Sequence, residues 1–243
     1  MQDPRSGILN FSEISSEGRS SEAVRAMFGS IARRYDLANH TLSCGCDFIW
    51  RQRAAAIVVE WNPAKIVDLA TGTGDLALAI QRTLPKSEVV GVDFSEEMLA
   101  LARGKGVQHT KVGDVLALPF PDRAFDCVTI AFGLRNVNDW AAALREMARI
   151  LTSNGHLLVL EFSLPQSFLL RAAYRFYLHR LVPVIGSFLT RKKSAYDYLG
   201  DSIEKFPGGA ALTNLINANG FRDATTQPLT GGIVTIYTAK KID

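Results

Sequence analysis

The sequence predicts an α/β fold built on a mostly parallel, seven-stranded sheet that is closed by an antiparallel strand. Two observations predict this fold. Between residues 65 and 162, short apolar runs alternate with segments of helical periodicity, which is typical of parallel strands joined by crossover helices. Near the C-terminus, two further strand-like runs lie too close together for a crossover connection, so they must pair antiparallel.

Five strands are expected in the first region, with the sequences KIVDLA, SEVVGVDF, HTKVGD, FDCVTIAF and GHLLVLEF. The C-terminal pair reads FRDATTQPL and GIVTIYTAKK and is joined through a Thr-Gly-Gly turn. Helices are expected over residues 75–84, 96–103 and 139–151. Ser95 is a good N-cap for the second helix, and the third should begin at Asp139.

Length and composition favour one domain and exclude several classes of protein. The chain has 243 residues, of which 47% are apolar, and this suffices for one large buried core. The first twenty residues are polar and broken by Pro4, Gly7 and Gly18, so no signal peptide is expected. No uncharged apolar run is long enough to span a membrane, and the three cysteines form neither a disulfide framework nor a paired metal motif. We therefore expect a cytoplasmic protein with reduced thiols.

A glycine turn follows the first strand and raises the question of which ligand it holds. Gly72-x-Gly74-x-x-Ala77 fits a dinucleotide fingerprint, and Asp93 follows at about the distance of a ribose-binding carboxylate. However, Asp75 lies in the first turn of the next helix, where a carboxylate opposes a diphosphate. Asp68 precedes the same turn. Two negative charges favour a ligand with an amino group and a sulfonium, and S-adenosylmethionine has both and no phosphate.

The third strand supports the same ligand. It ends in Gly113-Asp114-Val115, where Asp114 can accept a hydrogen bond from an adenine amine and Val115 offers an apolar contact. Three successive strand ends would then contact the methionine, ribose and adenine parts of the cofactor. The alternative is that Asp93 and Asp114 only cap helices or turns.

Several motifs together resemble the ubiquinone and menaquinone biosynthesis C-methyltransferases. They read DLATGTGD, GVDFSEEML, GDVLALPFPDRAFDCVTIAFGLRNVND, LREMARIL, GHLLVLEFS and TGGIVTIY, with RYDLAN, LSCGCDFIWR and YDYLGDSIEKFP between and before them. The resemblance covers nearly the whole chain, and AFGLRN and LTGGIV are its most specific parts. It implies a Rossmann-like class I methyltransferase that methylates a ring carbon of a polyprenylated hydroquinone. The first candidate acceptor is demethylmenaquinol, and the alternative is 2-methoxy-6-polyprenyl-1,4-benzoquinol.

The resemblance also implies site residues and partners. The candidate cofactor contacts are Asp68, Thr71, Gly72, Thr73, Gly74, Asp93, Phe94, Asp114, Val115 and Ala131, although Ala131 stands where the family can carry a polar residue. The expected partners are the prenylated quinol and S-adenosylmethionine, with no nucleic acid and no metal, and the number of subunits stays open. The single domain would comprise a helical N-terminal lid (1–62), a cofactor-binding core (63–162), a helical insert (163–205) and a last helix with the C-terminal hairpin (206–243).

Arg135 and Asn136 are the candidate acceptor-site residues. A hydroquinone carbon becomes nucleophilic when one hydroxyl loses its proton, and a guanidinium just past the fourth strand can stabilise the resulting phenolate. Asn136 could donate to the other ring oxygen, while water or Tyr35 relays the proton, polarised by Asp36 or Asp47. The alternative is that Arg135 pairs with a surface carboxylate and that Asn136 caps the following helix.

Two helical segments leave further alternatives open. In the leader SEAVRAMFGSIARRYD, one apolar face either packs on the core or also covers a ligand; this face comprises Val24, Met27, Phe28, Ile31 and Tyr35. From Ser163 to Tyr196 there are six basic residues and no acidic one. Within residues 168–193, Arg171, Arg175 and His179 form a basic stripe, which suits either an anionic membrane surface or a cover helix with its basic side in water. Two distant alternatives are a nicotinamide-dependent reductase and a non-catalytic quinone-binding protein.

Overall fold

The computed structural model describes residues 36–190 and 193–243. Tyr35 and the predicted leader helix before it lie outside the described residues. The first described segment is a helix over residues 36–42. The elements that follow it are α3 (Cys46–Trp61), β1 (Lys65–Leu69), α4 (Asp75–Thr83), β2 (Glu88–Asp93), α5 (Glu96–Lys105), β3 (His109–Val112), β4 (Phe125–Ala131), η1 (Leu134–Asn136), α6 (Trp140–Ile150), β5 (Leu151–Phe162), α7 (Phe168–Phe176), η2 (Tyr177–Leu181), α8 (Val182–Thr190), α9 (Lys193–Lys205), α10 (Ala210–Asn217), β6 (Phe221–Leu229), η3 (Thr230–Gly232) and β7 (Val234–Lys241).

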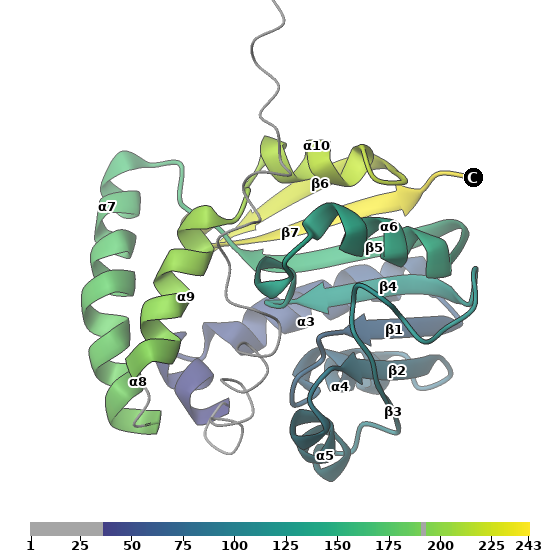
Figure 1. Cartoon of the computed structure of the whole chain (residues 1–243), viewed down its shortest axis with the longest axis horizontal. Coiled ribbons are helices and arrows are strands. Elements are labelled where there is room, and N and C mark those ends of the chain that lie inside the picture. The colour runs from purple at the N-terminus through teal and green to yellow at the C-terminus, as the bar shows by residue number, and fades with distance from the viewer. Residues whose placement is uncertain (1–35, 191–192) are drawn as a thin grey trace, which may run out of the picture.

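The predicted sheet is confirmed. Its seven strands lie in the order β3-β2-β1-β4-β5-β7-β6 (Figure 1). The first five strands pair parallel, and β7 pairs antiparallel with both β5 and β6. The order reverses at β1 and β4, so the crevice for a ligand is expected at the carboxyl ends of these central strands.

Helices cover both faces of the sheet because the central strands are apolar on both sides. Strand residues such as Val67, Val128 and Val159 pack with α6 and α10 on one face. On the other face, Ile66, Cys127 and Leu158 pack with α3 and α4. This double packing fixes the strand ends that carry the glycine turn and the Arg135 segment.

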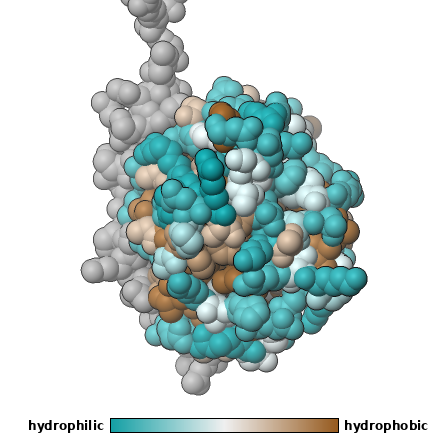
Figure 2. Space-filling view, turned by 90° about the vertical axis from the view of Figure 1, so that its right-hand side faces the viewer, coloured by the Kyte–Doolittle hydropathy of each residue, from teal (hydrophilic) through white to brown (hydrophobic). Residues whose placement is uncertain are grey.

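The predicted insert forms a helical layer beyond the carboxyl ends of the parallel strands, at the left of Figure 1. It consists of α7, the π-helical turn η2, α8 and α9, and it packs with the helix over residues 36–42. Its small core joins Ala38 to Tyr174, Leu178, Val182, Tyr196 and Ile203. None of the described helices is long and apolar enough to cross a membrane. The opposite end of the molecule, seen in Figure 2, is mostly hydrophilic with apolar residues in small separate groups.

Local signals placed the helix starts well, but two strands differ from the prediction: β5 begins at Leu151, four residues before GHLLVLEF, and β3 is shorter than expected. Ser95 caps α5 by accepting a hydrogen bond from the Met98 amide, and Asp139 caps α6 by accepting one from the Ala142 amide. The third strand ends at Val112, before the predicted Gly113-Asp114. Asp114 instead forms an isolated bridge with Ala117, because the chain turns directly after the strand.

Candidate functional site

The glycine turn uses its two glycines differently. Gly74 has φ of +86° and begins α4, and a Cβ there would lie 2.5 Å from the Val107 side chain. Gly72 has φ of +56°, but a Cβ there would have no atom within 4 Å. Gly74 therefore serves close packing of α4, whereas Gly72 borders open space into which a ligand can approach.

Asp93 holds the turn from the end of β2. Its Oδ2 accepts from the Gly72 amide at 2.8 Å, and its Oδ1 accepts from the Ser95 amide at 3.0 Å. The capping role considered from the sequence is therefore part of what Asp93 does. Its carboxylate therefore fixes the position of the turn at the end of β2. Phe94 follows directly and is half-buried.

Asp114 is exposed and closes its own turn, because its Oδ1 accepts from the Leu116 amide at 2.9 Å. Val115 beside it is buried, and Ala131 at the end of β4 is half-buried. These side chains lie on different strand ends of one sheet edge, as the sequence predicted. Their contacts with a cofactor stay a prediction.

Asp68 links β1 to the turn and to β4. It accepts from the Thr71 hydroxyl at 2.6 Å and from the Thr129 hydroxyl at 2.7 Å. Burial raises the pKa of Asp68 to about 6, against the lowering effect of these two hydrogen bonds. The Asp68 carboxyl thus connects the turn to β4. Its ionisation costs free energy because the group is buried, and a neighbouring cation would reduce this cost.

The negative charge predicted at Asp75 is balanced in the structure. Lys105 of α5 lies 2.7 Å from Asp75 and 2.6 Å from Asp36. Lys105 also donates to Thr73, which in turn donates to Asp36 at 2.6 Å. This compensation could not be predicted from local sequence, because Lys105 lies 30 residues from Asp75. The network joins the helix over residues 36–42 to the glycine turn.

A cavity of about 310 Å³ lies beside the turn, under the helical layer. Its walls are largely aromatic and aliphatic and include Trp50, Phe132, Phe162, Tyr174, Tyr177 and Leu178. The charged residues that line it are Asp47, Arg51 and Arg135. Arg51 also lies 3.8 Å from Asp75, so the cavity adjoins the first turn of α4.

Arg135 lines this cavity from η1 and forms a buried ion pair. Its Nη1 donates to Glu161 Oε1 at 2.7 Å and to the Phe132 carbonyl, and its backbone amide lies 3.3 Å from Glu161 Oε2. The alternative of a surface carboxylate is wrong, because Glu161 is fully buried at the end of β5. The Arg135 Nε has no hydrogen-bond partner among the described residues.

Asn136 also lines the cavity. Its Nδ2 donates weakly to the Phe132 carbonyl at 3.4 Å, and its Oδ1 has no partner among the described residues. The alternative that Asn136 caps the next helix is wrong, since Asp139 does so. Asn136 therefore has an unpaired acceptor in addition to the donor group that the sequence suggested, and its contact with a ligand stays a prediction.

A polar cluster around Asp47 forms the other end of the cavity. Asp47 accepts from Ser43 at 2.6 Å, lies 2.7 Å from His40 Nδ1 and pairs with Arg51. Burial opposes ionisation, but Ser43, Arg51 and His40 hold the pKa of the Asp47 carboxyl below its ordinary value.

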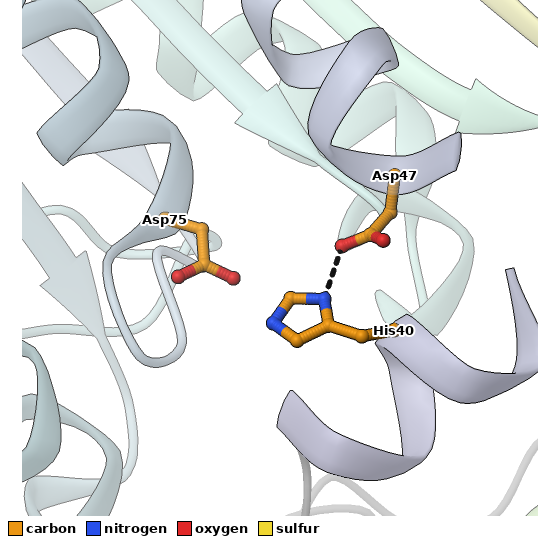
Figure 3. Close-up of side chains that lie close together, drawn as sticks. All are labelled: His40, Asp47 and Asp75. Carbon is orange, nitrogen blue, oxygen red and sulfur yellow. Dashed lines mark hydrogen bonds and ion pairs between the residues drawn. The ribbon is translucent and has the colours of Figure 1, made fainter. Parts of the chain in front are cut away.

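Figure 3 shows His40 between Asp47 and Asp75. One possible metal-ligand atom from each of the three residues lies within 4.8 Å of those of the other two. The guanidinium of Arg51 contacts both carboxylates, so a cation already balances this pair. The histidine spacing in the sequence did not reveal this cluster.

Sequence reasoning missed Glu161, Arg51 and the aromatic cavity walls. A signal for Glu161 existed, because it is the only charged residue of the apolar run LLVLEF and such a carboxylate requires a buried partner. Arg51 carried no comparable signal, since it lies in a helix whose polar residues suit an exposed face.

Comparisons with known proteins agree with the geometry. A demethylmenaquinone methyltransferase of Thermus thermophilus is 46% identical over 216 residues, which cover 87% of this chain and 98% of that protein. A ubiquinone/menaquinone biosynthesis C-methyltransferase UbiE of Geobacter sulfurreducens is 45% identical and covers 90% of this chain and 89% of that protein.

Solved structures show the same fold at lower identity. A S-adenosylmethionine-dependent methyltransferase of Thermotoga maritima, a possible histamine N-methyltransferase, superposes with a TM-score of 0.63 at 20% identity and covers 89% of this chain and 99% of that chain. The model of the ubiE/COQ5 methyltransferase family matches residues 16–241. The chain therefore belongs to the ubiE/COQ5 methyltransferase family.

Proposed function

We propose that this methyltransferase acts on a ring carbon of a polyprenylated hydroquinone and that its acceptor is demethylmenaquinol. The observation that carries the proposal is the aromatic cavity with Arg135 and Asn136 in its wall. Both side chains hold a polar atom that has no partner among the described residues, so a planar ligand with oxygen atoms would satisfy them. The printed names of the Thermus and Geobacter relatives support the acceptor.

S-adenosylmethionine fits the neighbouring strand ends as methyl donor. Gly72 leaves space for it, Asp93 and Asp114 place carboxylates at successive strand ends, and Asp68 favours a cationic ligand. The ten predicted contact residues lie at or next to these strand ends or in the turn. When bound, the cofactor supplies an electrophilic methyl group on a sulfonium.

Arg135 stabilises the acceptor as a phenolate. Its guanidinium is nine-tenths buried, so its attraction for a developing oxyanion is little screened by water. Asn136 accepts a hydrogen bond from the second hydroxyl and so orients the ring. The apolar walls exclude water and hold the ring face.

The proton leaves on the Asp47 side of the cavity. Asp47 is the only carboxylate among the described residues that line the cavity, and it accepts from Ser43, which also lines it. Asp36, the other sequence candidate, is bound to Thr73 and Lys105 instead. The relay predicted for Tyr35 stays a prediction, because that residue lies outside the described range.

The α7–α8 segment contacts a membrane surface in this proposal. Tyr174, Leu178 and Val182 face the cavity, whereas a second set of large apolar residues is exposed: Phe168, Leu169, Phe176, Leu181, Val184 and Phe188. Phe188 is 87% exposed and Phe168 81%. Such a concentration on one continuous segment, from α7 through η2 to α8, marks an interaction surface, and a lipid surface suits a lipid-soluble acceptor.

The basic stripe is less free than its sequence suggested. Arg175 and His179 both contact Glu204 of α9, and Arg171 donates to the Pro165 carbonyl. Arg180 is exposed and makes no ion pair with the described residues. The segment thus combines the two sequence alternatives, a cover over the cavity and an outer apolar face with basic residues.

An acceptor assay tests the proposal. Purified protein is mixed anaerobically with isotope-labelled S-adenosylmethionine and either demethylmenaquinol or 2-methoxy-6-polyprenyl-1,4-benzoquinol, and the products are analysed by mass spectrometry. We expect the label on a ring carbon of the naphthoquinol. A label on oxygen, or oxidation of NADH without methylation, would contradict the proposal. Faster turnover of the benzoquinol would favour the alternative acceptor, which the name of the Geobacter relative also includes.

A further inference from the structure

We infer that Glu161 is the positioning residue of Arg135: it fixes the guanidinium through Nη1 so that Nη2 stays available to the acceptor. This inference rests on the proposed function, because it assigns the guanidinium to the acceptor. Glu161 does not line the cavity and is fully buried at the end of β5. It can therefore act only through a neighbour.

Glu161 holds both the backbone and the side chain of Arg135. Its Oε1 accepts from Arg135 Nη1 at 2.7 Å, and its Oε2 lies 3.3 Å from the Arg135 amide. Oε1 also accepts from the Phe162 amide at 2.9 Å, which fixes the carboxylate on its own strand. The short η1 helix and its arginine are thus fastened to β5 by one side chain.

The contacts of the guanidinium are all concentrated on one nitrogen. Nη1 uses its two hydrogens for Glu161 and the Phe132 carbonyl. Nε is buried without a partner among the described residues, and the hydrogen bonds that Arg135 forms with them do not involve Nη2. Because the clamp uses only Nη1, Nη2 stays free to donate a charge-assisted hydrogen bond to the single oxygen of a phenolate.

The other groups around Glu161 do not replace this role. Tyr174 and Tyr237 lie near enough for Glu161 to act on them electrostatically, but burial raises the pKa of both phenols, so both stay neutral. Arg135 is the only cation that forms an ion pair with Glu161 among the described residues. The Phe162 ring, 5.2 Å from the Arg135 Cζ, completes the position by stacking.

The test is the variant Glu161→Gln. The amide oxygen can still accept from Nη1, but its NH₂ group would face the Arg135 amide, which is also a donor, so one of the two anchors is lost. We expect kcat for demethylmenaquinol to fall on the order of 10- to 100-fold, the loss that a misplaced reacting group produces. The dissociation constant for S-adenosylmethionine should stay at the wild-type value.

Glu146→Gln is the matched control. Glu146 also pairs with an arginine, Arg149 at 2.7 Å, and accepts from a backbone amide, that of Leu118 at 2.7 Å. It does not line the cavity. This variant should keep the wild-type kcat, and a loss equal to that of Glu161→Gln would overturn the inference, because the loss of any ion pair anchored to a backbone amide would then suffice.

A double-mutant cycle separates positioning from a general structural role. If Glu161 acts through Arg135, Glu161→Gln should cost little in an Arg135→Lys background. Additive losses would overturn the inference. If Glu161→Gln does not fold, Glu161→Asp serves instead, since it keeps the charge but shortens the reach, and wild-type kcat in this variant would equally contradict positioning.

The outcomes also separate this inference from the proposed function. A wild-type protein that transfers no methyl group to either quinol contradicts the proposed function. An active wild type whose Glu161→Gln variant keeps full kcat contradicts only the role of Glu161.

Discussion

Arg135 combines two properties that rarely coincide in one residue. Its charge is buried and paired, and burying a charge costs free energy unless the partner is well placed. The same side chain lines a cavity, and its Nη2 forms no hydrogen bond with the described residues. A purely structural ion pair would use its donors more completely. The residue therefore links the stability of η1 to the chemistry of the acceptor.

Arg135→Lys should reduce kcat by about 100-fold or more, because lysine keeps the charge but cannot hold Glu161 and present a planar donor pair at once. Cofactor affinity, measured by calorimetry, should stay unchanged. The control is Arg149→Lys, which alters a pair away from the cavity. If Arg135→Lys loses cofactor binding but its bound complex turns over normally, Arg135 does not act on the acceptor.

Asp93→Ala should weaken S-adenosylmethionine binding by about 1.5 to 3 kcal/mol, the range for a hydrogen bond to a charged group. The substitution also releases the Gly72 amide, so part of the loss comes from the turn. Calorimetric titration measures the effect, and Asp223→Ala, an exposed carboxylate paired with Arg222, is the control. Wild-type affinity in Asp93→Ala would contradict its place in the cofactor site.

Asp68 makes stability depend on pH. Its pKa is raised from 3.8 to about 6, so between these values the folded state binds more protons than the unfolded state. The free energy of unfolding should therefore fall as pH rises from about 4 to about 6 and stay lower above, by on the order of 3 kcal/mol. Asp68→Asn should remove this dependence, and urea unfolding at several pH values tests it. A constant difference between the two proteins from about pH 4 to about pH 8 would contradict the assignment.

At the scale of elements, what could be predicted depended on how local the signal was. Ser95 and Asp139 marked helix starts because a cap bonds to an amide three residues away. The partner of Arg135 could not be read in this way. Glu161 reaches it only because β4 and β5 pair in a register that sets Ala131 opposite Leu160. The orientation of the Asn136 amide was not predictable for the same reason, since it depends on the Phe132 carbonyl.

Lys105 should stabilise the helix over residues 36–42, because it forms ion pairs both with Asp36 of that helix and with Asp75 of α4. Lys105→Met removes both ion pairs, so amide hydrogen exchange in that helix should become faster. Lys65→Met, which loses only a loose surface pair with Glu88, should leave this exchange unchanged. Equal exchange rates in Lys105→Met and the wild type would show that packing alone holds the helix.

At the scale of the whole molecule, the sheet and its antiparallel closure followed from apolar patterning alone. The insert was harder, because a sequence shows one basic stripe but not which side faces the cavity. In the structure, Tyr174 of α7 lines the cavity, whereas Phe168 and Phe176 of the same helix are exposed on its outer side. Only the packing of α9, which brings Glu204 to Arg175, reveals how much of the basic charge is neutralised.

The outer apolar face should make the protein sediment with anionic vesicles at low ionic strength. Each basic residue near the surface contributes on the order of 1 kcal/mol, and salt screens this attraction. Replacing Phe168 and Phe188 by serine and Arg180 by glutamine should abolish sedimentation while preserving turnover of a short-tailed, water-soluble quinol. Val112→Ser, on exposed β3, is the control. If the triple variant still sediments like the wild type, the α7–α8 segment does not contact the vesicles and only covers the cavity.

The most direct test of the central claim is a single-turnover reaction in the cavity. Protein in excess over isotope-labelled S-adenosylmethionine is mixed with demethylmenaquinol under anaerobic conditions, in wild type and in Arg135→Lys, and the labelled product is followed with time. We predict one labelled methyl group on a ring carbon, formed rapidly by the wild type and at least about 100-fold more slowly by the variant, although both bind the cofactor equally. Equal rates in the two proteins, or a wild type that binds both ligands without forming the carbon–methyl bond, would contradict the account.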